Sequence, residues 1–411
     1  MIFRLAIRNL TRHHRRSLIT ASSVMFGSWL SLTTIGIGNY TYNNMIDDSA
    51  TMGFGHVAVL PDGYLKEPSL KLAISQAETV EQKIAATGLV RQILPRIMGA
   101  GMASTASNNR GIQFIAIDPE KESAKTSLLL KHIHQGKLFT RDDHQGALIG
   151  ARLAKNLNLK IGKKFVLTTT DITGEVVTAL FRVRGIFRTG LDETDGYSIL
   201  VSLPGIQKVL SYRPDQLTML SLLIHDQRNT PEVVQDLSGV AAVPGQTFLG
   251  WRETQPDLAG FVAIDRGGNQ VFLIFLGLLI GLGVLNTMFM SVMERIRVFG
   301  CMLALGLPPG ILIRSVMLES VLLSTGGLLA GSAIALVCDW LLRTRGLDLS
   351  FLLQEGTSAA GVIFDPVLRS LLFANDFLVV WPAFILMTVL ASIVPAIRAG
   401  RLQPVEAMTH R

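Results

Sequence analysis

The chain has 411 residues, of which 49% are hydrophobic and only 17% are charged, and it carries a formal net charge of +7. A soluble protein of this length has about 25% charged residues, so the composition excludes an ordinary soluble protein and indicates long apolar segments. The basic surplus does not indicate a nucleic-acid partner, because the arginines stand beside those apolar segments.

The N-terminal region predicts a leader helix followed by a membrane span. Residues 1–16 place apolar side chains mostly along one helical face and arginines opposite, which is typical of a helix lying in the membrane interface. A plain extension of the following span is the alternative. Residues 17–38 are apolar and rich in Ser, Thr and Gly. We interpret them as a retained transmembrane helix rather than a cleaved signal, since no small-residue cleavage site follows.

Residues 39–270 predict one large α+β domain. Segments 55–60 and 111–118 alternate like strands, and residues 75–88 have the pattern of a helix closed by a glycine. Residues 146–203 predict a helix followed by strands, and residues 218–253 resemble the opening strand–helix–strand pattern. We therefore expect a split α+β lobe with a β-rich insertion at about 119–216. Both cysteines lie outside this domain, so it folds without a disulfide.

Further apolar segments at 271–293, 311–338 and 377–397 are each long enough to span a bilayer. Arginines cluster in the leader, in residues 294–310 and in the tail 398–411, whereas the loop 339–376 is net acidic. The positive-inside rule therefore places both termini and residues 294–310 in the cytoplasm, and the large domain and the 339–376 loop in the periplasm. The predicted fold class is an α-helical membrane protein with four transmembrane helices plus a large α+β extracytoplasmic domain.

Two pairs of glycines in the predicted spans have the spacing that lets membrane helices approach closely: Gly277/Gly281 and Gly327/Gly331. The alternative is that these glycines reflect only the general abundance of glycine in membrane helices.

The stretch 294–310 predicts a short amphipathic helix at the cytoplasmic surface. An apolar stripe at helical spacing consists of Ile296, Phe299, Leu303 and Leu307. We expect this stripe to enter a cleft of a soluble partner, so that Asp at Phe299 or Leu303 would abolish coupling without preventing membrane insertion. A helix lying in the lipid headgroups is the alternative.

No catalytic, cofactor-binding or metal-binding motif stands out in the sequence. The phosphate-binding pattern G-x-x-x-x-G-K-[ST] is missing, and His132, His134 and His144 lack acidic partners at ligand spacing. In the membrane half, Arg314 and Glu319 form an ionisable pair that should face protein or water, because buried charge is costly there. We interpret Glu319 as a helix-contact residue rather than a substrate ligand.

Residues 293–320, MERIRVFGCMLALGLPPGILIRSVMLES, resemble the E-R-x-R-E-[FI]-G-x-L-x-A-[LI]-G…E motif of FtsX-type permeases of ABC transporters. Two outer-domain blocks, ALIGARLAKNLNLKIGKKFVLTT and FRVRGIFRTGLDETDGYSILVSL, resemble the lipoprotein-releasing branch of that family. Val298 stands where the family usually has an acidic residue, so an ion pair between that acid and the ATPase is not carried over to this chain. Residues 394–408, VPAIRAGRLQPVEAM, are similar to the closing signature of the family at Pro395, Ala396, Ala399, Pro404 and Glu406.

The resemblance implies a type VII ABC transporter in the bacterial inner membrane. Such a permease works with a second permease copy, identical or a sister chain, and with a separate ABC ATPase dimer that binds ATP and Mg²⁺, while the permease itself binds no cofactor. The resemblance also makes residues 294–310 the coupling helix. The residues that it assigns to ATPase coupling are Glu294, Arg295, Arg297, Phe299, Gly300, Leu303, Ala304 and Gly306.

The function implied is extraction of lipoproteins or other lipid-anchored cargo from the inner membrane, with a periplasmic lipoprotein carrier or adaptor as a further partner. Two alternatives stay open. One is export of a drug, peptide or glycolipid through a periplasmic adaptor and an outer-membrane channel. The other is relay of ATP-driven motion to a periplasmic enzyme without any cargo.

Overall fold

The computed structural model describes residues 14–351, 358–359, 362–363 and 367–401. The predictions for residues 1–13 and 402–411, with Pro404 and Glu406, lie outside the described residues. The chain divides into two compact units. The membrane unit comprises residues 1–41, 264–349 and 367–411, and the outer domain comprises residues 42–263 with 350–366.

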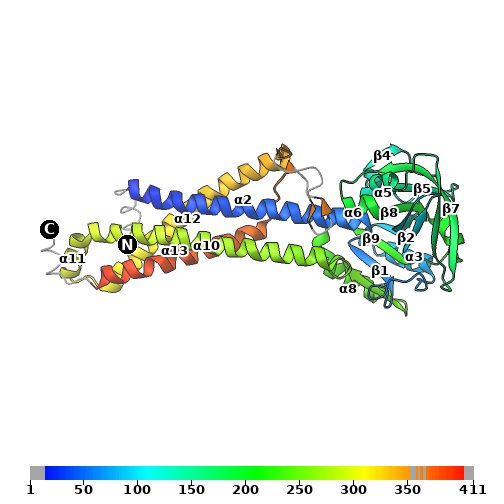
Figure 1. Cartoon of the computed structure of the whole chain (residues 1–411). Coiled ribbons are helices and arrows are strands. Elements are labelled where there is room, and N and C mark those ends of the chain that lie inside the picture. The colour runs from blue at the N-terminus through cyan, green and yellow to red at the C-terminus, as the bar shows by residue number, and fades with distance from the viewer. Residues whose placement is uncertain (1–13, 352–357, 360–361, 364–366, 402–411) are drawn as a thin grey trace. The chain divides into compact units, whose positions relative to one another are not determined.

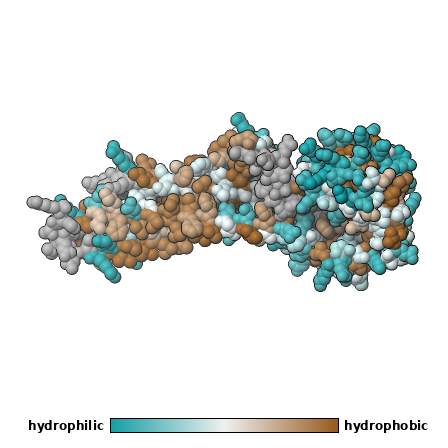
Figure 2. Space-filling view, viewed as in Figure 1, coloured by the Kyte–Doolittle hydropathy of each residue, from teal (hydrophilic) through white to brown (hydrophobic). Residues whose placement is uncertain are grey.

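Among the described residues, four helices are long and apolar enough to cross a membrane: α2 (His14–Met52), α10 (Pro256–Glu294), α12 (Pro309–Thr344) and α13 (Ala374–Gly400). The helix surface in view is mostly hydrophobic, whereas that of the outer domain is largely hydrophilic (Figure 2). On α10 the exposed apolar side chains include Val271, Phe272, Phe275, Leu278, Leu279 and Leu282. In a membrane protein such a surface faces lipid or another membrane helix.

Helices α2 and α10 are longer than the predicted spans 17–38 and 271–293. Residues 39–52 contain neither Gly nor Pro, so the helix continues past the apolar segment until Gly53. In the outer domain the end of α2 packs against the start of α10, and apolar side chains of both form one cluster with Trp251: Tyr42, Met45, Ile46, Leu258 and Val262. Hydropathy marks only the part of a helix that lies in lipid, and this packing stabilises the rest.

A series of polar contacts joins α12 to α13 inside the membrane unit. The Ser320 and Ser392 hydroxyl oxygens lie 3.0 Å apart, and Thr388 Oγ1 donates to Ser324 Oγ at 3.2 Å. Further along, Trp381 Nε1 donates to Ser332 Oγ at 3.0 Å. Because each hydroxyl finds a partner on the neighbouring helix, these polar groups stabilise one register of the pair.

Gly327 and Gly331 lie where α12 closely approaches α2. A Cβ atom added at Gly327 would lie 2.7 Å from the backbone oxygen of Ala21 and 2.8 Å from Val24 Cβ. Gly331, one turn on, likewise faces Met25 and Ser28 of α2. The Gly277/Gly281 pair is less crowded. The nearest side chain to an added Cβ atom is Met387, at 3.5 Å from Gly277 and 3.1 Å from Gly281.

We expect Gly327→Leu to weaken the α2–α12 packing, because overpacking of a tight contact costs about 1–3 kcal/mol. The adjacent Gly326 is the matched control, since nothing lies within 4 Å of a Cβ added there. Thermal unfolding of both Leu variants in the same detergent should show a lower midpoint for Gly327→Leu only. Equal midpoints would show that the close contact is not needed for stability.

The outer domain is built on one ten-stranded mixed sheet (Figure 1). Its strands are β1 (Val57–Pro61), β2 (Val90–Ser104), β3 (Asn109–Ile117), β4 (Ile133–Gly136), β5 (Gly146–Gly150), β6 (Lys164–Thr170), β7 (Val176–Phe187), β8 (Ser198–Ser202), β9 (Met219–Ile224) and β10 (Gln246–Gly250). The helices are α3 (Ala77–Ala86), α4 (Leu128–Lys131), α5 (Ala151–Asn156), α6 (Asp192–Tyr197), α7 (Leu203–Val209), α8 (Thr230–Val240) and α9 (Trp251–Thr254), with a 3-10 turn at Gln227–Asn229.

The predicted insertion at about 119–216 does not form a separate sheet. Its strands β8, β5, β7 and β6 continue the sheet from β3. Strand β6 also pairs with β2, so the pairings run from β2 through β3, β8, β5, β7 and β6 and back to β2. The long strand β2 makes this possible because it pairs with β9 in its first half, with β6 at its end and with β3 alongside. The sequence gives little sign of this strand, since Pro95, Gly99 and Gly101 interrupt its pattern.

Most strands near the centre of the sheet are buried on both faces. In β1, Val57 and Val59 belong to one apolar cluster whereas Ala58 and Leu60 belong to another. Because successive side chains of a strand point to opposite faces, the two clusters lie on the two sides of the sheet. The domain thus has a large apolar core without a disulfide, as both cysteines are free.

Candidate functional site

The stretch between α10 and α12 folds into a short helix, α11 (Ile296–Ala304). Gly306 ends it with a φ of +86°, a conformation that favours glycine. Its N–H donates to the Leu303 carbonyl at 3.0 Å, and the Leu307 N–H donates to the Met302 carbonyl at 3.1 Å. These two bonds form a Schellman motif, which satisfies the last carbonyls of the helix and turns the chain sharply into α12.

One face of α11 is buried against the membrane helices. Phe299 is 5% exposed, and Gly300 beside it is also buried. Leu303 and Leu307 are partly buried against the apolar cluster to which Phe299 belongs. The buried members of that cluster from α10, α12 and α13 are Val292, Leu312, Val316, Ala396 and Ala399.

The prediction that this stripe enters a partner is therefore wrong for Phe299. Helical spacing shows that one side of a helix avoids water, but it does not show which apolar surface covers that side. Here the chain's own helices cover it. Phe299 contributes to the packing that holds α11 in place and is not open to a soluble protein.

The opposite side of α11 is open. Val298 is 48% exposed and Leu305 is 89% exposed, and Cys301 between them is exposed as well. Residues spaced by three and four positions lie on one side of a helix, so we call Val298, Cys301 and Leu305 the exposed face of α11. The remaining predicted coupling residues that are exposed border this face: Glu294, Arg297, Ala304 and Gly306.

Arg295 stands at the start of α11 and is only 6% exposed. Its Nη2 lies 2.9 Å from Glu319 Oε2 and 3.1 Å from Oε1, and Glu319 of α12 is itself 5% exposed. The same nitrogen donates to Ser291 Oγ at 2.6 Å, and Nε donates to the Ser291 carbonyl at 3.1 Å. The guanidinium carbon also lies 5.4 Å from the centroid of the Phe299 ring. One side chain thus links α10, α11 and α12.

This geometry corrects one prediction. Arg295 was expected to contact the ATPase, but it is buried and instead fixes the position of α11. Arg314 and Glu319 were expected to face protein or water, and Arg314 is exposed whereas Glu319 is buried against protein. Five residues correspond to about 500° of rotation in an α-helix, so the two side chains leave α12 in directions about 140° apart. The ion pair to Arg295 fits the interpretation of Glu319 as a helix-contact residue.

Sequence reasoning missed two parts of this site. Ser291 lies four residues before Arg295, a helical spacing that could have indicated the contact. The exposed face was overlooked because Leu305 and Cys301 lie outside the apolar stripe that defined the amphipathic pattern. In the part of the chain that the structure describes, no group of three or more His, Cys, Asp or Glu side chains could hold a metal ion.

Comparison with known proteins matches both parts of the chain to family models. The FtsX-like permease C-terminal model matches residues 270–404, and the MacB-like periplasmic core domain model matches residues 17–240. The lipoprotein-releasing system transmembrane protein LolC of Xylella fastidiosa is 25% identical over 309 residues, which covers 72% of this chain and 72% of LolC.

Two further relatives are similar to this chain over most of its length. LolE of Haemophilus influenzae, also a lipoprotein-releasing system transmembrane protein, is 23% identical over 363 residues and covers 86% of this chain and 85% of LolE. The macrolide export ATP-binding/permease protein MacB of Neisseria gonorrhoeae is 21% identical over 367 residues, covering 85% of this chain but 55% of MacB.

Proposed function

The chain belongs to the family of FtsX-like permeases with a MacB-like periplasmic core domain, and from this membership we propose that it extracts lipoproteins or similar lipid-anchored cargo from the membrane. It is an ABC transporter permease of the LolC, LolE and MacB type, a membrane protein with four apolar helices and a periplasmic-type domain. The cargo and the assembly belong to the proposal.

The observation that carries the proposal is the course of α10. This single helix begins in the outer domain at Pro256, continues through an apolar segment, and ends at Glu294 directly before α11. A soluble motor that displaced the exposed face of α11 would therefore act on a rod that reaches the outer domain. The buried contacts of Arg295 support this role, because they bond the start of α11 to Glu319 of α12 and to Ser291 of α10.

The assembly that we propose contains two permease chains, identical or sister copies, and a separate ATPase dimer. ATP and Mg²⁺ bind to the ATPase, and this chain binds no cofactor. We place the complex in the bacterial inner membrane with both termini and α11 in the cytoplasm and the outer domain in the periplasm. The arginines near the termini and in residues 294–310 support this orientation.

Lipid-anchored cargo is supported by the relatives. LolC and LolE match this chain over 72% and 85% of their own lengths, and both are named as components of lipoprotein-releasing systems. A periplasmic lipoprotein carrier or adaptor would accept the released cargo. The proposal needs no continuous polar channel through the membrane helices, since the cargo starts at the outer leaflet.

Depletion of this chain in its host should leave lipid-anchored proteins in the inner membrane that otherwise reach the outer membrane. Metabolic labelling with a palmitate analogue, followed by separation of the two membranes, measures this redistribution. Re-expression of the unaltered chain should restore sorting, whereas the Leu305→Asp variant of the exposed face should not. Unchanged sorting together with raised drug sensitivity would favour tripartite export instead, and unchanged sorting with altered cell-wall hydrolysis would favour relay to an enzyme.

A further inference from the structure

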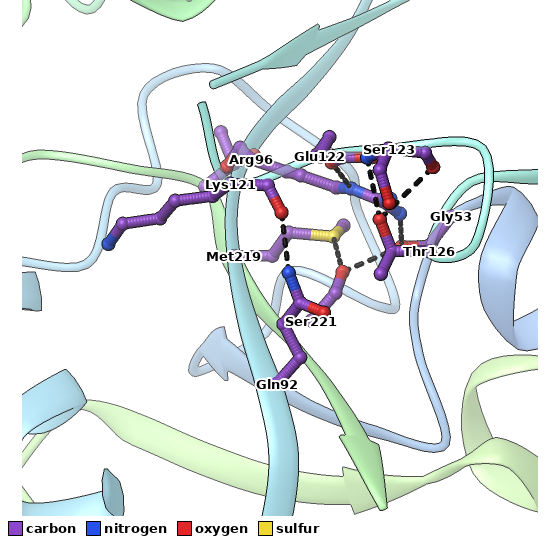
Figure 3. A network of polar contacts seen from close by, with 10 residues as sticks. Gly53, Gln92, Arg96, Lys121, Glu122, Ser123, Thr126, Met219 and Ser221 are labelled. Atoms are coloured by element: carbon purple, nitrogen blue, oxygen red, sulfur yellow. Dashed lines mark hydrogen bonds and ion pairs between the residues drawn. The ribbon is translucent and has the colours of Figure 1, made fainter. Parts of the chain in front are cut away.

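The point where α2 ends lies inside the outer domain and is held by polar contacts (Figure 3). Gly53, the first residue after the helix, has a carbonyl oxygen that accepts hydrogen bonds from Arg96 Nη1 and, at 2.6 Å, from Ser221 Oγ. Arg96 belongs to β2 and Ser221 to the neighbouring strand β9. The end of the helix is thus bonded to two adjacent strands of the sheet.

Arg96 is in turn held by a buried carboxylate. Its Nε lies 2.6 Å from Glu122 Oε1 and its Nη2 lies 2.8 Å from Glu122 Oε2, and the two side chains are 1% and 0% exposed. The loop that carries Glu122 is itself fixed: Gln92 Nε2 donates to the Lys121 carbonyl at 2.5 Å. The guanidinium can therefore neither rotate nor withdraw from Gly53 without breaking several bonds.

Stability alone does not explain this ion pair. Removing two charges from water is costly, and an apolar pair of similar volume is often equally stable or more so. The surrounding core is apolar, with Ala50, Leu94 and Leu223 forming a cluster beside the end of α2. A guanidinium differs from an apolar side chain in that its hydrogen bonds are directional. They fix the orientation of the bonded groups, which apolar contacts leave free. A cation also suits the negative end of the α2 dipole.

The position of Arg96 in the sheet lets it act on the whole domain. In register it lies opposite Ile117 of β3 on one side and Met219 of β9 on the other. Further along, the same strand pairs with β6. A displacement of Gly53 would therefore pull on β2, the strand that is hydrogen-bonded to β3, β6 and β9.

We propose that Arg96, held by Glu122, is a positioning residue that sets the angle at which α2 enters the outer domain and so transmits displacement of α2 to the sheet. This inference rests on the proposed function, because it takes ATP hydrolysis as the cause of the displacement. Ser221 is the second hydrogen-bond donor to the Gly53 carbonyl. Without these bonds the domain still folds on its apolar core, but α2 turns within it.

The test uses the full complex with its ATPase in nanodiscs. The variant Arg96→Met/Glu122→Leu removes both buried charges and leaves none unpaired. The control is Arg141→Met/Glu120→Leu, which removes an ion pair of the same loop region whose side chains are 56% and 62% exposed. Spin labels at Lys163 of the outer domain and Trp340 of α12, in a background without the native cysteines, report the distance between the two units with and without ATP.

In the unaltered complex and in the control, ATP should shift the distance distribution. In the Arg96→Met/Glu122→Leu variant the shift should be lost and the distance distribution broadened. The unfolding midpoint should stay close to that of the unaltered complex, and the rate of ATP hydrolysis should stay within about twofold of it. An unchanged shift in this variant would overturn the inference. Absence of any shift in the unaltered complex would instead contradict the proposed function.

Should the double variant fail to fold, Arg96→Lys decides the question by the same measurement. A lysine keeps a cation beside Glu122, but its single ammonium group cannot reproduce the fork that reaches both Glu122 and Gly53. Loss of the shift in this variant supports the inference, and a normal shift overturns it.

Discussion

The Leu305→Asp variant is expected to lose the ATP hydrolysis that the permease stimulates in its ATPase, while the permease still folds and inserts. Leu305 is 89% exposed, so a carboxylate there remains hydrated in the isolated chain. In a complex the same carboxylate would be desolvated without a partner. Central apolar contacts of an interface often contribute about 2 kcal/mol or more, which corresponds to roughly 30-fold weaker association.

The measurement is the rate of ATP hydrolysis in proteoliposomes as a function of ATPase concentration. Val240→Asp is the matched control, since Val240 is an apolar residue of the outer domain that is 62% exposed. The Leu305→Asp variant should need far more ATPase for half-maximal stimulation, whereas the control should behave like the unaltered chain. Normal stimulation by Leu305→Asp would show that the ATPase docks elsewhere.

Phe299→Asp separates the two sides of α11. The sequence predicts that this change prevents coupling and leaves insertion intact. The structure instead places the new carboxylate within the apolar cluster beneath α11. We therefore expect it to destabilise the folded chain as well as to prevent coupling, because a buried unpaired charge is costly.

The Glu319→Ala variant is expected to be among the most destabilising single changes in the membrane unit. It leaves the Arg295 guanidinium buried without its carboxylate, and breaking a buried pair in this way costs about 3–5 kcal/mol. A second nitrogen of Arg295, Nη1, already has no hydrogen-bond partner among the described residues, so the site has little capacity to compensate. Thermal unfolding in detergent should show a clearly lower midpoint.

Two further variants test this explanation. Arg295→Met/Glu319→Leu removes both charges and should recover most of the lost stability, since apolar side chains of similar volume can replace a buried pair. Arg314→Met should have almost no effect, because Arg314 is exposed. If Glu319→Ala unfolds at the same temperature as the unaltered chain, the ion pair is not a structural link between α11 and α12.

Much of the architecture is visible in the sequence. The four apolar segments predict the membrane helices, because each is long enough to span a bilayer and carries few ionisable groups. The alternating patterns at 55–60 and 111–118 predict strands β1 and β3. The motif at 293–320 resembles FtsX-type permeases, and the family models confirm this resemblance. These features are local, so a short window contains the whole signal.

Only the tertiary structure decided which surfaces meet. Arg295 and Glu319 are 24 residues apart, and Arg96 and Glu122 are 26 apart, so no local spacing pairs them. The apolar stripe of α11 shows that one side is buried, yet the burying surface comes from α10, α12 and α13. Likewise, β2 acquires its role from strands that lie far along the chain. Periodicity determines which side of an element avoids water, whereas long-range packing determines its partner.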